Sequence, residues 1–126
     1  MRRFSVFAAL SLTVGETGCA KPDHVMKIES PEKGLFYTVE TFKGHGPVDA
    51  DFIRVYAHLE RDGKSDRQLV LDGEYLEISK ITWVDRDNVK LCLQGGFTNS
   101  FHNQVTLRVN GSPSETIHTH LLENCE

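Results

Sequence analysis

The sequence predicts an all-β fold, an antiparallel sandwich or small barrel of about six or seven strands. Three observations favour this class. Apolar and polar residues alternate with a period of two in several short segments, and Asp-Gly, Asn-Gly and Gly-Gly turn signals separate those segments. No segment after the first twenty residues carries a long helical stripe of apolar residues. The chain of 126 residues is long enough for one domain, which is expected over residues 32–126.

The first strands are expected after the Ser30-Pro31-Glu32-Lys33-Gly34 turn cluster. Residues 35–42 are rich in aromatic and β-branched side chains, which are typical of a strand. Residues 52–60 alternate cleanly between apolar and polar positions and form the clearest strand of the chain. Their apolar residues predict one buried face: Ile53, Val55, Ala57 and Leu59.

Hairpin signals continue the predicted meander. Asp62-Gly63 is a type I′ turn signal, which places the partner strand at residues 68–71. Asp72-Gly73 is expected to turn the chain again, toward a strand at residues 75–84. Within that strand the apolar residues change from even to odd positions, which predicts a β-bulge near Ser79-Lys80.

The second half of the chain repeats this pattern. A turn is expected at residues 85–88, and Gly95-Gly96 is expected to end the strand that follows it. Asn110-Gly111 marks another turn, and residues 115–122 could close the sheet. Two rows of apolar residues are expected to face the core: Val89, Leu91 and Leu93, then Val105, Leu107 and Val109.

The N-terminus has the pattern of a secretory signal peptide, which we expect over residues 1–18. Met1-Arg2-Arg3 supplies a positive segment, and residues 4–14 carry no charge. This uncharged run is about half as long as a membrane-spanning helix requires. The sequence therefore predicts export from the cytoplasm.

The stretch Thr17-Gly18-Cys19-Ala20 resembles the processing site of bacterial lipoproteins, in which small residues precede a cysteine. The resemblance implies that Cys19 becomes the acylated first residue and anchors the protein in a lipid bilayer. Because Ala20 and Lys21 follow the cysteine, the resemblance also implies an outer-membrane location facing the periplasm. Glu16 departs from the pattern, which has an apolar residue there. The alternative is cleavage after Ala20, which would release a soluble periplasmic protein.

Residues 19–31 are expected to form the lipidated N-terminus and a tether, since they combine Pro22 and Pro31 with mixed charges. The remaining two cysteines, Cys92 and Cys125, are an even number in an oxidising compartment and predict a disulfide. The alternative is two unpaired thiols.

No cofactor, metal site or enzymatic activity is expected. His118 and His120 would share a strand face, but two ligands do not make a zinc site. The chain lacks a Gly-x-Ser-x-Gly elbow and a Ser-x-x-Lys motif. Its net charge is −4 and its basic residues are interleaved with acids, so nucleic acid is not expected as a partner.

Two long, Gly-rich loops, residues 43–51 and 94–103, are the expected binding segments. His45, Phe97 and Phe101 are the candidate binding residues, although the two Phe rings could instead cover the end of the core. The expected function is a non-enzymatic envelope module that binds an envelope or external protein, as an inhibitor, exclusion or assembly factor. The alternatives are a small-ligand carrier and a hydrolase whose catalytic residues meet only in the folded chain.

Overall fold

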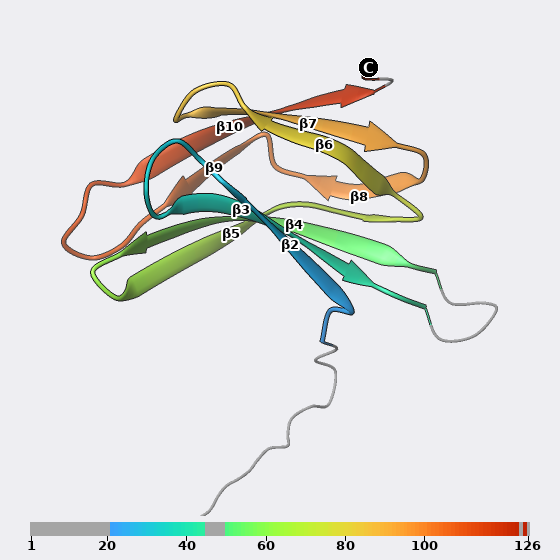
Figure 1. Ribbon diagram of the computed structural model, residues 1–126, viewed down its shortest axis with the longest axis horizontal. Coiled ribbons are helices and arrows are strands. Elements are labelled where there is room, and N and C mark those ends of the chain that lie inside the picture. The colour runs from blue at the N-terminus through green and yellow to red at the C-terminus, as the bar shows by residue number, and fades with distance from the viewer. Residues whose placement is uncertain (1–20, 45–49, 124, 126) are drawn as a thin grey trace, which may run out of the picture.

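The computed structural model describes residues 21–44, 50–123 and 125. Within these ranges the chain forms strands and no helix (Figure 1). The nine strands exceed the expected six or seven. They are β2 (His24–Glu29), β3 (Leu35–Phe42), β4 (Phe52–Arg61), β5 (Lys64–Glu74), β6 (Glu77–Trp83), β7 (Asn88–Gln94), β8 (Phe97–Phe101), β9 (Gln104–Leu107) and β10 (Glu115–Glu123).

The strands form two sheets that pack face to face, so the all-β prediction is confirmed as a sandwich and not as a closed barrel (Figure 1). The order in the five-stranded sheet is β2-β3-β4-β5-β8, and in the four-stranded sheet β6-β7-β10-β9. All neighbouring strands are antiparallel except β7 and β10, which are parallel. The expectation of a wholly antiparallel fold is therefore wrong for this one pair. Parallel pairing requires a long connection, which here includes β8 and β9.

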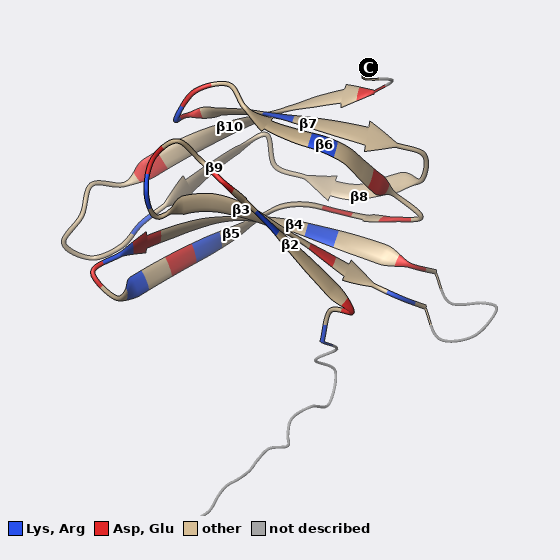
Figure 2. Ribbon diagram, viewed as in Figure 1, with Lys and Arg blue, Asp and Glu red and all other residues tan. Residues whose placement is uncertain are grey.

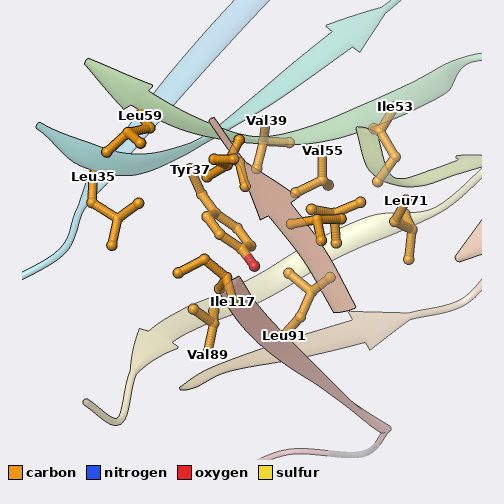
Figure 3. Packing of buried hydrophobic residues seen from close by; sticks show 14 of the residues in the cluster. Leu35, Tyr37, Val39, Ile53, Val55, Leu59, Leu71, Val89, Leu91 and Ile117 are labelled. Atoms are coloured by element: carbon orange, nitrogen blue, oxygen red, sulfur yellow. The ribbon is translucent and has the colours of Figure 1, made fainter. Parts of the chain in front are cut away.

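The core lies between the sheets and is built from the alternating residues that the sequence placed inward (Figure 3). Tyr37 of β3 is fully buried and reaches the other sheet, where its hydroxyl lies 2.5 Å from the hydroxyl of Thr119 on β10. Burial raises the pKa of Tyr37 to about 12, so the phenol stays protonated and hydrogen-bonded at neutral pH. The core also contains all three residues of each predicted inward row: Val89, Leu91 and Leu93, then Val105, Leu107 and Val109.

Two predicted chain irregularities are confirmed and one turn is wrong. Asp62 and Gly63 have φ of +52° and +77°, as a type I′ turn requires, and the β6–β7 register shifts between Ile78 and Lys80. Asp72-Gly73 is not a turn, because β5 continues to Glu74. Gly73 instead allows β8 to approach, since a Cβ there would collide with the Phe97 carbonyl oxygen.

The folded domain begins earlier than expected. Residues His24–Glu29, assigned to a tether from the sequence, form β2 and pair with β3 from His24–Thr41 to Glu29–Phe36. The tether prediction is therefore wrong for these residues, because pairing with β3 satisfies backbone groups that a tether would leave to water. The predicted signal peptide and Cys19 lie outside the described residues.

Candidate functional site

The predicted disulfide is present. Cys92 of β7 is bonded to Cys125, with their Cα atoms 6.0 Å apart. The bridge joins the chain just beyond β10 to the neighbouring strand, on the outer side of the four-stranded sheet, because Cys92 alternates with the core residues Leu91 and Leu93.

The outer side of the five-stranded sheet is covered with rings. Residues directly opposite one another on neighbouring strands point to the same face, and the register aligns Phe42, Phe52, Glu74 and Phe97 in one row across four strands. Further along β3 and β4, Phe36 is opposite His58. We call the rings on this side of the sheet the aromatic face: Phe36, Phe42, Phe52, Tyr56, His58 and Phe97.

Most of these rings contact one another. Phe42 and Phe52 are stacked with their centroids 4.6 Å apart, and so are Phe36 and His58. Tyr56 meets His58 edge to face at 6.2 Å. Such cross-strand aromatic pairs stabilise a sheet by roughly 0.2–1 kcal/mol each beyond alanine pairs.

Cations lie over the same rings. The ammonium of Lys27 is 4.2 Å from the Phe36 centroid, and the guanidinium of Arg67 is 4.1 Å from the Tyr56 centroid. Arg54 lies 5.2 Å from Phe42 and 5.3 Å from Phe52. Figure 2 shows these basic positions on β2, β4 and β5. The aliphatic parts of such side chains cover apolar surface while their charges stay in water, which explains why Phe36 and Phe42 are buried on an outer face.

His58 is the titratable group at the centre of this arrangement. Its Nε2 lies 2.7 Å from the Thr38 hydroxyl. Burial lowers the pKa of His58, and the nearby charges of Arg67 and Lys27 lower it further, against the opposing effect of Glu60. The ring is therefore neutral at pH 7 and packs as an aromatic residue.

One end of the aromatic face is exposed. Phe97 is 68% exposed, and Tyr75, in the turn after β5, is 60% exposed. Gly96, next to Phe97 in the chain, lies against the backbone of Tyr75, since a Cβ on Gly96 would come within 2.5 Å of the Tyr75 carbonyl. Tyr75 has a φ of +55°, which is rare for a bulky residue, and its N–H donates to the Asp51 carbonyl at 2.9 Å. Such a conformation costs on the order of 1–3 kcal/mol and often marks a functional position.

The predicted binding residues have different positions. Phe97 is exposed as expected, whereas Phe101 pairs with Leu71 and packs against the core, so its assignment as an exposed anchor is wrong. His45 lies outside the described residues. The loop predicted over residues 43–51 does precede Phe52, but most of the loop predicted over residues 94–103 is the strand β8, so that prediction is wrong for Phe97–Phe101. Phe52 and Phe97 lie in one row with Glu74, so the segments that precede them reach the sheet at the same end. Tyr75 was not predicted as a binding residue. The only feature of the sequence that points to it is its position directly after Asp72-Gly73-Glu74.

The opposite end of the sandwich carries an ionic cluster. Arg61 contacts Glu32 at 2.7 Å, and Arg86 contacts Glu32 at 3.1 Å and Glu115 at 2.7 Å. These residues come from both sheets, so the cluster joins the layers at that end. A hollow of about 860 Å³ lies beside it, and its lining includes Lys27, Phe36 and Lys64.

His118 and His120 of the four-stranded sheet border a hollow of about 670 Å³. His120 Nε2 lies 3.1 Å from the Asn88 side-chain oxygen, and Glu115, which also borders this hollow on the four-stranded sheet, is bound by Arg86. No group of three His, Cys, Asp or Glu side chains among the described residues is placed to hold a metal ion. The part of the chain that the structure describes also contains no helix long and apolar enough to cross a membrane.

Comparison of the chain with known protein families, with characterised proteins and with solved structures finds no match.

Proposed function

We propose that this chain is an exported, lipid-anchored protein whose β-sandwich binds another protein without catalysing a reaction. The observation that carries the proposal is the pair Tyr75 and Phe97, the two most exposed large apolar side chains among the described residues. Exposed aromatic residues held on a rigid scaffold are the side chains that most often dominate protein–protein binding.

The surroundings of the pair indicate the chemistry of the partner. Glu74 is exposed and lies directly opposite Phe97. Asp51 is also exposed, and its backbone carbonyl accepts a hydrogen bond from the N–H of Tyr75. The pair therefore has an acidic rim. A partner surface with an apolar pocket for the rings and basic residues around it would match this end of the domain.

Export and anchoring are proposed from the leader. The Cys92–Cys125 disulfide supports them, because disulfides persist in oxidising compartments outside the cytoplasm. With Cys19 acylated, only residues 20–23 separate the lipid from β2, so the anchor holds the domain close to the bilayer.

Metabolic labelling with an alkynyl fatty acid tests the anchor. Label is expected on the parent protein and absent from Cys19→Ser. Replacing Glu16 with Leu is expected to increase processing, because the lipoprotein pattern has an apolar residue there. No label on the parent, or label that persists in Cys19→Ser, contradicts lipidation and leaves the soluble periplasmic form.

Photocrosslinking in the native envelope tests the binding surface. A photoreactive residue at position 75 or 97 is expected to capture one protein. The same residue at position 84, which is 54% exposed in the native chain and lies in the turn at the other end of β6, is expected not to capture it. The combination Tyr75→Asn and Phe97→Ser should abolish binding of that protein while the melting temperature stays within a few degrees. Equal capture from position 84, or none from positions 75 and 97, contradicts the proposal.

A further inference from the structure

β2 is the outermost strand of the five-stranded sheet, and half of its backbone groups face away from that sheet. The N–H of Ser30 donates to the Leu35 carbonyl at 3.0 Å, and that of Glu60 donates to the Gly34 carbonyl at 2.7 Å. Hydrogen-bonding direction alternates along a strand, so odd-numbered residues of β3 bond to β2 and even-numbered residues bond to β4. In the observed register the even-numbered residues of β2 bond to β3. The backbone groups of Val25, Lys27 and Glu29 therefore point to the free edge.

The other sheet edges of the described chain carry features that hinder pairing. β8 is five residues long and shifts register against β5, and β6 shifts register against β7 between Ile78 and Lys80. β9 is only four residues long. Short strands and bulges are the usual protection against edge-to-edge association. β2 pairs regularly over six residues and contains no proline, so it lacks both protections.

The side chains of β2 are also left open. Val25 is 51% exposed and Met26 is 42% exposed. A hollow of about 290 Å³ lies beside the strand, between the two sheets, and it is lined mainly by apolar side chains: Met26, Val39, Ile53, Leu76 and Ile78, together with His24, Thr41 and Glu77. The only lysine of β2 is Lys27, which could protect the edge from pairing but lies instead over the Phe36 ring of its own sheet.

Charge selects a self-complementary register for this edge. Because the free groups belong to odd-numbered residues, two copies of β2 related by a twofold axis can pair in only a few ways. One register sets Lys27 opposite Lys27, which is repulsive, and another sets Asp23 opposite Glu29, which is also repulsive. A third sets Lys27 opposite Glu29 twice, with Ile28 facing Ile28 on the axis. A fourth register would set Lys27 opposite Asp23, but the Asp23 N–H already donates to the Thr41 carbonyl at 2.8 Å and its carboxylate accepts from the Lys43 N–H at 2.7 Å, so Asp23 is engaged with its own sheet. Only the third register pairs opposite charges using residues of β2 alone.

We propose that a second copy of this chain pairs its β2 antiparallel to β2, in the register that places Lys27 opposite Glu29. Each Lys27–Glu29 pair exchanges its two backbone hydrogen bonds, and the five-stranded sheets of both copies join into one continuous sheet. The Ile28 side chains meet on the core side of that sheet, since Ile28 is opposite the buried Tyr37. The aromatic faces of the two copies then lie on the same side of the joined sheet.

The interface is short, so the dimer is weak and depends on concentration. Light scattering after size-exclusion chromatography of the full chain carrying Cys19→Ser is expected to show a mass that rises toward twice the monomer mass with concentration. Lys27→Glu, which sets like charges opposite each other twice, should raise the dimer dissociation constant roughly tenfold. The exchange Lys27→Glu with Glu29→Lys reverses both charges and should restore the dimer.

Cysteine substitutions test the register. In the proposed pairing Ile28 faces its own copy as a non-hydrogen-bonded pair, with Cα atoms about 4.5 Å apart, within the range of a disulfide. Ile28→Cys in the Cys19→Ser chain is therefore expected to form a covalent dimer under mild oxidation. Lys27→Cys should not, because residue 27 meets itself only in the repulsive register.

A monomer at every concentration overturns the proposal, whether or not the chain binds a foreign peptide at this edge. A dimer that Lys27→Glu leaves intact, or that the charge exchange fails to restore, places the interface elsewhere and also overturns it. None of these results depends on lipidation or on Tyr75 and Phe97, so they leave the proposed function to its own experiments.

Discussion

The two outer faces of the sandwich are built differently. The outer side of the five-stranded sheet is the aromatic face, where rings stack and cations lie over them. The outer face of the four-stranded sheet is polar and includes Thr82, Lys90, Thr106, Thr116, His118 and His120. A solvent-facing side of an antiparallel sheet is ordinarily polar, so the aromatic face is the exception that requires an explanation.

Each sheet has a different means of holding its strands together on the outer side. The aromatic face gains side-chain packing that the polar face lacks, and Phe36 and Phe42 are nearly as buried there as core residues. The polar face has the Cys92–Cys125 bridge instead. The comparison teaches that an outer face can be structural over most of its area and available for binding only at its end, where Tyr75 and Phe97 are exposed.

Removing the disulfide should have the largest effect. Cys92→Ser with Cys125→Ser opens a loop with a sequence separation of 33, and the chain-entropy estimate for a loop of that length is a loss of about 3–4 kcal/mol in unfolding free energy. Urea denaturation measures it, with Cys19→Ser as the cysteine control. A loss below about 1 kcal/mol would mean that strand pairing alone holds the polar face, and the contrast between the faces would disappear.

Truncating a buried ring of the aromatic face should cost less. Phe36 is 6% exposed, stacked on His58 and covered by Lys27, so Phe36→Ala is expected to lower the unfolding free energy by about 1.5–3 kcal/mol, which is the contribution of burying one such side chain. Thr82→Ala, at an exposed position on the polar face, is the matched control and should change it by less than about 0.5 kcal/mol. Equal effects at the two positions would remove the structural role of the aromatic face.

Acidification should weaken the aromatic face through His58. Its pKa is lowered in the folded protein by burial and by Arg67, so the unfolded chain binds a proton first as the pH falls. The stability contributed by neutral His58 is present above about pH 6.5 and is lost as the pH falls from there through the folded-state pKa. The slope cannot exceed about 1.4 kcal/mol per pH unit for one proton.

Unfolding free energies measured across this range should fall less steeply in His58→Gln than in the parent. Thr82→Ala, on the polar face, removes no titratable group and is the control that should keep the slope of the parent. If His58→Gln leaves the slope unchanged, His58 does not carry the pH dependence.

The smallest expected effect separates the exposed end of the aromatic face from the rest. Tyr75→Asn places a residue that tolerates positive φ where the structure has a φ of +55°, so it should raise the unfolding free energy by about 0.5–1 kcal/mol. Phe97→Ser, at a side chain 68% exposed, should leave it nearly unchanged. Thermal and urea denaturation compare the two variants. A clear loss in either would show that the exposed rings hold the fold.

Local patterns predicted much of the fold. The alternation in residues 52–60, the inward row from Val89 to Leu93 and the Asp62-Gly63 turn are properties of neighbouring residues, and all three are observed. The disulfide followed from cysteine number and compartment. The parallel pairing of β7 with β10 could not be predicted in this way, because it joins segments whose own sequences do not specify their partner.

The candidate site was harder to predict because it depends on register. Phe97 and Phe101 are four residues apart and would share a face in a regular strand. The register shift between Asp72 and Gly73 breaks that regularity, so Phe97 is opposite the exposed Glu74 while Phe101 is opposite the buried Leu71. The sequence contains no local signal for this shift other than Gly73, which was interpreted as a turn.

The position of β10 also determines when the domain can be completed. β10 is the last strand described and lies inside its sheet, between β7 and β9, which have no direct pairing with each other. Until it arrives, the four-stranded sheet is split and Cys92 lacks its bonding partner. Pairings between distant segments form slowly, since the loop between them must close first. The strands of the five-stranded sheet, in contrast, all lie within residues 24–101, so they can pair before β10 is available.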